Sequence, residues 1–344
     1  MPGSPSGAVK RRQRISTSLA ILRGVLATRE VGVMAALFLL FLFFGTLRPR
    51  AFLRVENLLN VARQVSLLGI MGIGMTFVLV SREIDLSVES IYALGGVVCA
   101  MMVTSGTGIL TSIIFTVLIV GFGFGLINGL LCTYGKIPSL VVTLGMLSAA
   151  RGVGLVISEG KIIFTNPRTV ADIHLSDFLF LGQGKLFDFI PMQFIIFLIL
   201  LLFGWIILRL TTWGFHTYAT GGNERAARVS GIKVFRIKIL AFVLSGVLAS
   251  WAGILNLSFL GVVQGTAGTG LSLDVIAAVI IGGASLSGGE GTMWGTLIGV
   301  FIMGILRNGL VILGMNPFWQ TIAIGVVIII AVAIDMWIRR AREV

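Results

Sequence analysis

The chain has 344 residues, of which 56% are hydrophobic and only 12% are charged. So few charged residues cannot cover the surface of a soluble protein of this length, and the strict alternation typical of a membrane β-barrel is absent. The net charge of +12 does not indicate a nucleic-acid partner either, because the basic residues gather beside apolar segments.

Apolar segments of about 20 residues, long enough to cross a bilayer as helices, recur along the chain. They predict an all-α, polytopic membrane protein with about ten transmembrane helices, in one domain over residues 31–338. The predicted spans are residues 31–47, 64–81, 84–104, 109–133, 138–158, 191–209, 239–260, 271–287, 292–313 and 318–338.

The basic residues at the two ends of the chain predict its orientation. Residues 1–30 carry six Lys and Arg, and residues 339–344 carry three Arg. Short segments rich in Lys and Arg stay in the cytoplasm, so we expect two cytoplasmic tails, which agrees with an even number of spans. The first apolar run lacks a small-residue cleavage site, so we expect it to be a retained helix.

Residues 48–63 do not follow this pattern. They carry four Arg, yet the parity of the spans places them outside. We expect this segment to lie at the membrane interface as an amphipathic piece.

Two regions of the chain share an order of motifs. Asp, Gly-Gly, Asn-Gly, Pro and Thr occur in this order within residues 85–143 and again within residues 274–321. Five spans separate the copies, an odd number, so the second copy would be inverted relative to the first. Inverted repeats place a solute path near the repeat interface. The alternative is a chance resemblance among glycine-rich helices.

Glycines at intervals of four residues predict close helix contacts. The pattern GxxxGxxxG occurs at residues 121–129 and again at residues 291–299. Such glycines clear a stripe along a helix, which lets a second backbone approach.

Acidic residues at membrane depth are costly, so they are expected to face protein or water. Asp85 and Asp274 each stand at the start of a span and near a serine. Their carboxylates either cap the free N–H groups of a helix or contact a solute, and the residues alone leave both readings open. The candidate path residues are Asp85, Ser87, Asn128, Thr143 and Asp274.

No arrangement for catalysis or metal binding is visible in the sequence. Cys99 and Cys132 lie in apolar runs, and His174 and His216 have no partner at metal-ligand spacing. The motifs GxSxG and HExxH are absent. We therefore expect no catalytic residues, no metal site and no enzyme activity in this chain.

Several motifs, taken together, resemble the permease subunits of bacterial ABC importers of the ribose type. The resemblance covers residues 35 to 335 approximately. It rests on "REIDLSVES", "KIPSLVVTLGMLSAARG", "TGGNERAARVSGIKV", "GTGLSLDVIAAVIIGGASLSGGEGTMWGTLIG" and "NGL", which occur in this order.

The resemblance implies a subunit of a larger assembly in the bacterial inner membrane. In this family two permease subunits, identical or different, work with two cytoplasmic ATPase subunits and an extracytoplasmic sugar-binding protein. The implied function is ATP-driven uptake of a monosaccharide or a similar small polar solute. The motif GxxxxGK[ST] is absent, so ATP and Mg²⁺ are expected on the partner ATPase and no cofactor on this chain.

The chain departs from the family pattern at two positions. Glu83 and Glu89 stand where the family typically has glycine, so that "GIDLSVGS" reads "EIDLSVES". Two additional carboxylates near the expected path weaken the assignment of any particular sugar.

Residues 210–238 form the coupling loop that the resemblance implies, the segment that docks on the ATPase. Its residues suit a short rigid helix with an apolar contact surface and a charged rim. The alternative is a loop that binds anionic membrane lipid through its basic residues. The candidate coupling residues are Asn223, Glu224, Ala226, Ala227, Arg228 and Gly231.

Two other transport functions remain as alternatives. One is a permease of the same superfamily for a nucleoside, a branched-chain amino acid or a sugar-derived signal. The other is a stand-alone secondary transporter that uses Asp85 or Asp274 as a proton carrier.

Overall fold

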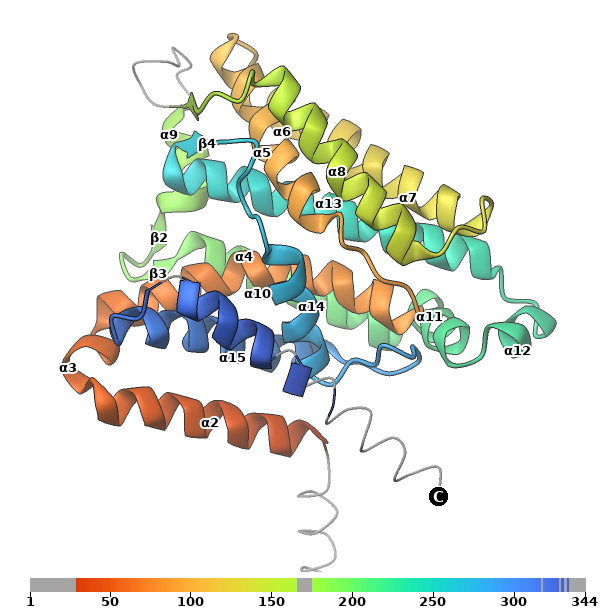
Figure 1. The fold of residues 1–344 in the computed structure, drawn as a ribbon. Coiled ribbons are helices and arrows are strands. Elements are labelled where there is room, and N and C mark those ends of the chain that lie inside the picture. The colour runs from red at the N-terminus through yellow and green to blue at the C-terminus, as the bar shows by residue number, and fades with distance from the viewer. Residues whose placement is uncertain (1–28, 166–174, 317, 328, 331–332, 334–344) are drawn as a thin grey trace, which may run out of the picture.

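The computed structural model describes residues 29–165, 175–316, 318–327, 329–330 and 333, and these are mostly helical (Figure 1). Among these described residues, six helices are long and apolar enough to cross a bilayer, and four shorter apolar helices accompany them. Each predicted span coincides with one of these helices, which confirms the all-α polytopic fold. Residues 1–28 and 334–344, which include most of both predicted tails and the end of the last predicted span, lie outside the described residues.

The helices are joined mainly by short connections. In chain order they are α2 (Arg29–Leu47), α3 (Pro49–Phe52), α4 (Val55–Val80), α5 (Val88–Thr104), α6 (Ile109–Thr116), the π-helix η1 (Val117–Phe122), α7 (Gly123–Thr133), α8 (Ser139–Ile157), α9 (Leu175–Gln183), α10 (Met192–Leu210), α11 (Thr212–Gly222), α12 (Glu224–Val229), α13 (Val234–Leu260), α14 (Leu271–Ile281) and α15 (Met293–Ile312). A further apolar helix covers Phe318–Val327.

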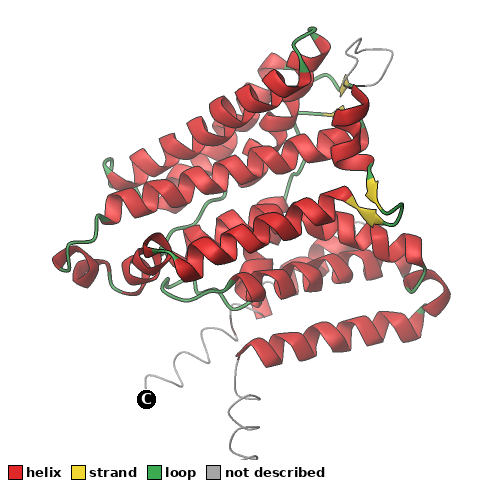
Figure 2. Ribbon diagram, turned by 180° about the vertical axis from the view of Figure 1, so that it is seen from behind, coloured by secondary structure: helices red, strands yellow, loops and turns green. Residues whose placement is uncertain are grey.

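Two short antiparallel strand pairs lie among the connections. β1 (Ile163–Phe164) pairs with β4 (Val262–Val263), which joins the segment after α8 to the end of α13. β2 (Lys185–Leu186) pairs with β3 (Ile190–Pro191) as a hairpin before α10. These pairs and α3 lie at one end of the bundle, and α11 and α12 lie at the other (Figures 1 and 2).

The centre of the bundle is the contact between α4 and α13, the two longest helices. Gly74 of α4 faces Ser245 of α13, and a Cβ at Gly74 would lie 2.7 Å from the Ser245 Cα. Only glycine therefore permits this approach, which brings the two backbones together as small-residue contacts do in membranes.

Both predicted glycine patterns pack against neighbouring helices. Gly121, Gly125 and Gly129 face α13, and a Cβ at Gly125 would lie 2.6 Å from the carbonyl oxygen of Phe242. In the second pattern, at residues 291–299, Gly295 and Gly299 face the end of α14. The prediction of close helix contact is confirmed for both patterns.

The segment at residues 48–63 differs from the expectation of a separate interfacial piece. Pro49 opens the four-residue helix α3, because its fixed φ suits the first position of a helix. Arg54 is extended, and α4 begins at Val55, nine residues before the predicted span. The second half of the segment therefore belongs to a membrane helix.

Two predicted spans are shorter than expected. The span at residues 84–104 begins as a helix only at Val88, because residues 83–87 form an irregular turn. The span at residues 271–287 ends at Ile281, where Gly282 and Gly283 break the helix. At 1.5 Å per residue, the 11 residues of α14 cover about 16 Å, roughly half of a 30 Å hydrocarbon core.

The packing of the two repeat copies is reciprocal. Helices α5 and α7 of the first copy pack on α13, and helices α14 and α15 of the second copy pack on α4. The helices of each copy thus pack against the long helix that precedes the other copy, while α4 and α13 contact each other. This exchange agrees with a two-fold relation between the copies.

The two ends of the bundle give a direct test of orientation. In a background with Cys99→Ala and Cys132→Ala, single cysteines at the exposed positions Ser176 and Ser230 report on opposite ends. We expect a membrane-impermeant maleimide to label Ser176→Cys from outside the cell and Ser230→Cys only after the cytoplasmic side is opened. Labelling of both from the same side would contradict the ten-span topology.

Candidate functional site

Buried polar side chains lie at the starts of helices α5 and α14. Asp85, fully buried, lies just before α5 and accepts hydrogen bonds from the Ser87 backbone N–H at 3.0 Å and the Ser87 Oγ at 2.6 Å. Ser245 Oγ of α13 donates to its second oxygen at 2.8 Å. Asp85 thus binds the N–H of Ser87, the residue just before α5, and both of its oxygens have partners within the chain.

Two other candidate path residues lie in or beside this cluster. Asn128 of α7 donates from Nδ2 to Ser87 Oγ at 2.8 Å, so Asp85, Ser87 and Asn128 are brought together. Thr143 of α8 packs beside the same turn and donates to the Ser139 carbonyl at 2.8 Å. The side chains of Asp85, Ser87, Asn128 and Thr143 are all buried, and none of them lines the cavity beside Asp274.

The start of α14 is capped by a residue of the other repeat copy. Glu89 Oε2 accepts hydrogen bonds from the Gly270 N–H at 2.8 Å, the Ser272 N–H at 3.2 Å and the Ser272 Oγ at 2.9 Å. Its other oxygen accepts from Arg151 Nη2 of α8 at 2.8 Å. A carboxylate at a helix N-terminus meets both its free N–H groups and the positive end of its dipole.

The sequence did not reveal this role of Glu89. One feature of the sequence could have indicated it. Glu89 is a carboxylate in the first turn of a span, close to Asp85, and no basic residue nearby in the sequence could pair with it in the membrane. Nothing in the sequence pairs it with residues 270–272, about 180 positions later, because only the packing of α5 beside α14 brings them together.

Asp274 does not cap α14. It lies in the first turn of α14, and its Oδ2 accepts from Arg307 Nη2 of α15 at 2.6 Å. Its side chain is buried, whereas that of Arg307 is half-exposed. Glu89 takes the capping position, which leaves Asp274 to pair with the guanidinium.

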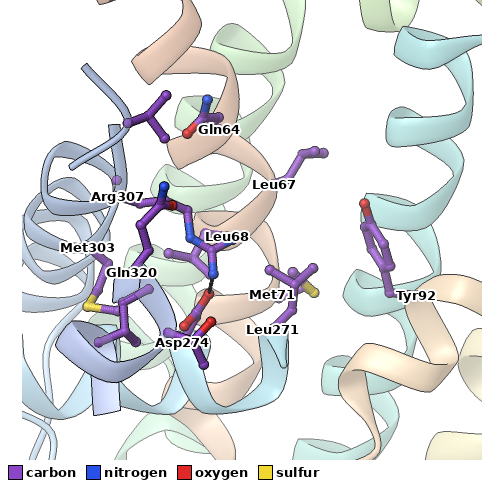
Figure 3. Close-up of a pocket in the computed structure, with 14 residues that line it drawn as sticks. Gln64, Leu67, Leu68, Met71, Tyr92, Leu271, Asp274, Met303, Arg307 and Gln320 are labelled. Atoms are coloured by element: carbon purple, nitrogen blue, oxygen red, sulfur yellow. Dashed lines mark hydrogen bonds and ion pairs between the residues drawn. The ribbon is translucent and has the colours of Figure 1, made fainter. Parts of the chain in front are cut away.

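A cavity of about 480 Å³ opens beside this ion pair (Figure 3). It lies between the first turns of α5 and α14, the middle of α4, α15 and the helix at Phe318–Val327. Its wall is mostly apolar, with six polar side chains. These are Gln64, Tyr92, Asp274, Arg307, Gln320 and Thr321. Asp274 is the candidate path residue that lines it.

The predicted coupling segment folds into two short helices. Asn223 caps α12, because its Oδ1 accepts from the Ala226 N–H at 3.0 Å. Gly231 ends it with a φ of +83°, and the N–H groups of Gly231 and Ile232 bond back to the carbonyls of Arg228 and Ala227 at 3.0 Å. The predicted N-cap at Asn223 and the predicted helix end at Gly231 are both confirmed.

The contact surface on α12 differs from the predicted one at Ala227. Its side chain faces inward and is buried, so it is not available to a docking partner. Ala226 and Val229 are exposed, and Val229 is 86% exposed. The helix has only six residues, so one apolar position must anchor it to the protein while the others face outward.

A chain of ion pairs ties α12 to the interior. Lys238 Nζ, near the start of α13, lies 2.8 Å from Glu224 Oε2 of α12 and 2.7 Å from Glu83 Oε1. Glu83 stands two residues before Asp85, in the same turn. Arg228 also pairs with Glu224 at 2.6 Å.

This network holds Glu224 as a carboxylate. Its partial burial by itself would raise its pKa, but the hydrogen bonds and charges of Lys238 and Arg228 outweigh burial and hold the pKa of Glu224 below its usual value. The ion pairs of Glu224 therefore stabilise the attachment of α12 fully at a pH above the ordinary carboxyl pKa. This stabilisation is lost as the pH falls through the lowered pKa of Glu224.

Over the part of the chain that the structure describes, no three His, Cys, Asp or Glu side chains are grouped as metal ligands. The six polar side chains in the cavity wall offer hydrogen bonds and an ion pair.

The sequence is similar to known membrane permeases. Residues 57–332 match the family model described as "Branched-chain amino acid transport system / permease component". The ribose import permease protein of Bacillus subtilis is 42% identical over 307 residues, covering 89% of this chain and 92% of that protein. That of Escherichia coli K12 is 40% identical over 302 residues, covering 88% and 92%.

A third relative has a different described cargo. The autoinducer 2 import system permease protein of Photorhabdus luminescens is 33% identical over 323 residues, covering 94% of each chain. No solved structure is significantly similar to this chain.

The Glu89–Arg151 pair predicts a large interaction energy between two distant segments. Removing either partner leaves a buried charge without its counter-charge, which costs about 3–5 kcal/mol. In a double-mutant cycle of Glu89→Gln and Arg151→Gln, followed by unfolding of the detergent-purified protein, we expect a coupling above about 1 kcal/mol. The exposed pair Glu159–Lys161 is the matched control, expected below about 0.5 kcal/mol. Equal couplings for the two pairs would show that the Glu89–Arg151 ion pair adds no more stability than an exposed pair does.

Proposed function

Because this chain belongs to the family of branched-chain amino acid transport system permease components, we propose that it is the membrane-spanning permease subunit of an ATP-driven ABC importer. Its cargo is a monosaccharide or a similar small polar solute delivered by a binding protein. The relatives named for ribose import and autoinducer 2 import support this choice of cargo. A permease for a nucleoside or a branched-chain amino acid is the second candidate, since the family description names the latter.

The structure of the α12 segment is the main support for this proposal. A capped helix with an exposed apolar end projects at one end of the bundle (Figure 1). Ion pairs attach it to the turn that contains Asp85. A contact that transmits force must be short and rigid, and it must be connected to the part that moves. A loop that serves only to bind anionic lipid needs basic charge but no such connection.

ATP hydrolysis belongs to a separate subunit in this proposal. The sequence has no GxxxxGK[ST] motif with which to cradle phosphates, so ATP and Mg²⁺ are expected on cytoplasmic ATPase subunits. The exposed surface formed by Ala226, Val229 and the flanking Arg225 is the proposed docking site. With this end in the cytoplasm, both termini of the chain are cytoplasmic too.

Further partners are proposed on the membrane-embedded faces. The apolar side chains of α8 and α10 are largely exposed in the single chain, as expected of helices that face lipid or a second permease subunit. The extracytoplasmic binding protein would meet the end that carries β2, β3 and α9. These assignments follow the family and the topology.

A stand-alone transporter would use Asp85 or Asp274 as its proton carrier, and both carboxylates already have partners within the chain. Asp85 accepts three hydrogen bonds from serine groups, and Asp274 is paired with Arg307. A proton carrier must exchange its proton with water on each side in turn. The contacts of these two carboxylates favour a structural cap and a cavity wall instead.

Docking through α12 can be tested at Val229. We expect Val229→Glu to abolish ATP-dependent uptake and to release the ATPase subunits on purification, while membrane insertion stays normal because the side chain lies outside the bundle. The measurement is uptake into proteoliposomes together with co-purification of the complex. Val229→Leu, which keeps an apolar end, is the matched control. A Val229→Glu permease that retains its ATPase subunits and transports normally would leave lipid binding as the function of the loop.

The ion-pair chain can be tested at Lys238. Lys238→Gln leaves Glu83 without a counter-charge and separates α12 from the Asp85 turn. We expect ATPase subunits to remain bound and to hydrolyse ATP, while solute uptake per ATP falls about tenfold, the effect of roughly 1.4 kcal/mol. Lys233→Gln, an exposed lysine one turn earlier, is the control and should transport normally. Unchanged uptake per ATP in Lys238→Gln would remove this network from the coupling route.

A further inference from the structure

Three arginines lie at the end of the bundle opposite α12, and their guanidinium groups have no hydrogen bond or ion pair among the described residues (Figure 1). Arg48 precedes α3, Arg50 lies in it and Arg54 follows it, and all three are exposed. Glu56 lies close by in the first turn of α4, so residues 48–56 carry a net charge of +2. Basic residues usually gather on the cytoplasmic side of a membrane protein, whereas the proposed topology puts this segment outside. Orientation therefore does not explain the cluster, and its charge is available to an anion.

The segment that carries these arginines is held in place by its neighbours. The Phe52 side chain is fully buried, and its ring packs edge-on against that of Phe41 of α2, with 5.3 Å between the ring centroids. Asn57 donates from Nδ2 to the Phe52 carbonyl oxygen at 2.9 Å. Asn57 and Asn308 of α15 also exchange two side-chain hydrogen bonds, at 3.0 Å and 2.8 Å. The arginines on either side of Phe52 therefore extend from a fixed backbone.

An apolar groove of about 410 Å³ starts from the same residue, Phe52, and lies between α2 and α4. All of its lining side chains are apolar. Met34, Phe38 and Phe41 of α2 form one wall, Leu58 of α4 belongs to the other, and α15 packs against both helices behind them. The side chains of Met34, Phe38, Phe41 and Leu58 are exposed in the single chain. The groove is therefore open to the membrane along α2, and the arginines stand at one end of it.

The size of the groove suits a thin occupant. One turn of an α-helix with its side chains is about 10 Å across and about 5.4 Å long, which is roughly 420 Å³. The groove would admit only about one such turn, too little for the helix of a partner protein. At roughly 30 Å³ for each water-sized group, the same space takes about a dozen methylene groups of an acyl chain.

The headgroup of such a lipid, and not its chain, would determine its affinity. The groove and the surrounding bilayer are equally apolar, so a chain that moves from one to the other gains little hydrophobic free energy. A guanidinium binds a phosphate through two parallel hydrogen bonds, and each basic side chain at a membrane surface attracts anionic lipid. The net positive charge of residues 48–56 therefore favours an anionic headgroup over a zwitterionic one.

We propose that the arginines of residues 48–54 and the groove between α2 and α4 together bind one anionic phospholipid. Its phosphate contacts Arg50 and Arg54, and one of its chains lies along Phe38 and Leu58. The lipid fills the gap between α2 and α4 and so completes the attachment of α2 to the bundle. The site is at the opposite end from α12, and it gives the arginines outside the membrane a binding role.

The test uses the full-length permease in a neutral detergent and two lipids with the same chains, phosphatidylglycerol and phosphatidylcholine. By native mass spectrometry we expect one phosphatidylglycerol to bind about tenfold more tightly than phosphatidylcholine, a difference of roughly 1.4 kcal/mol. The double variant Arg50→Gln/Arg54→Gln should lose this preference. Lys161→Gln/Lys185→Gln removes two exposed lysines at the same end of the bundle, so this matched control should keep it.

A second measurement locates the chain of the bound lipid. Phosphatidylglycerol with a photoreactive diazirine on its chain, in nanodiscs that hold the full-length permease, should label α2 and α4 at the groove more than α8, which is also exposed. Leu58→Trp fills the groove with a larger side chain, so we expect labelling of α2 to fall at least about threefold, roughly 0.7 kcal/mol. Leu140→Trp, at an exposed apolar position of α8, is the matched control and should leave the labelling of α2 unchanged.

Three results would overturn the proposal. The first is equal binding of the two lipids by the unmodified chain, or a preference that survives Arg50→Gln/Arg54→Gln. The second is photolabelling spread evenly over α2, α4 and α8, which would show ordinary contact with the bilayer. The third is displacement of the bound lipid by inorganic phosphate alone, which would assign the arginines to a free anion and leave the groove without a role in binding.

Discussion

The arrangement of this protein depends on how two helices are allowed to begin inside a membrane. The first N–H groups of a helix need acceptors, and the hydrocarbon core supplies none. Asp85 binds the Ser87 N–H just before α5, and Glu89 binds the N–H groups of Gly270 and Ser272 at the start of α14. Glu89 belongs to α5 and its partner Arg151 belongs to α8, so a single carboxylate joins three helices from both repeat copies.

Neutralising these helix starts also determines the character of the cavity between them. Glu89 is held at the α14 N-terminus, and the two charged side chains described in the cavity wall, Asp274 and Arg307, pair with each other. The same pairing argues against a proton-carrying role for Asp274.

The turn at residues 81–87 connects this interior to α12, the proposed coupling helix. Glu83 in this turn pairs with Lys238, and Asp85 at its other end binds Ser87 just before α5. A displacement of α12 would reach Lys238 through Glu224, then the turn, then the start of α5, whose first turns line the cavity. The ion pairs in this route are 2.7–2.8 Å long, and their Lys238 and Glu83 side chains are mostly buried, whereas Glu224 is partly exposed.

The sequence by itself determined the all-helical membrane fold and the positions of its spans, because long apolar runs between polar loops have few alternatives in a bilayer. It also located α12, since Asn223 and Gly231 are local signals that act within a few residues. The glycine stripes at residues 121–129 and 291–299 likewise predicted close packing.

Only the tertiary structure decided which helix each stripe meets and which face of α12 is free, as the inward-facing Ala227 shows. It also decided the partners of the carboxylates: Asp85 with Ser245, Glu89 with Gly270 and Arg151, Asp274 with Arg307. These pairs join residues from 33 to 181 positions apart. A local pattern shows that a buried carboxylate needs a partner, whereas the choice of partner depends on which helices the packing places side by side.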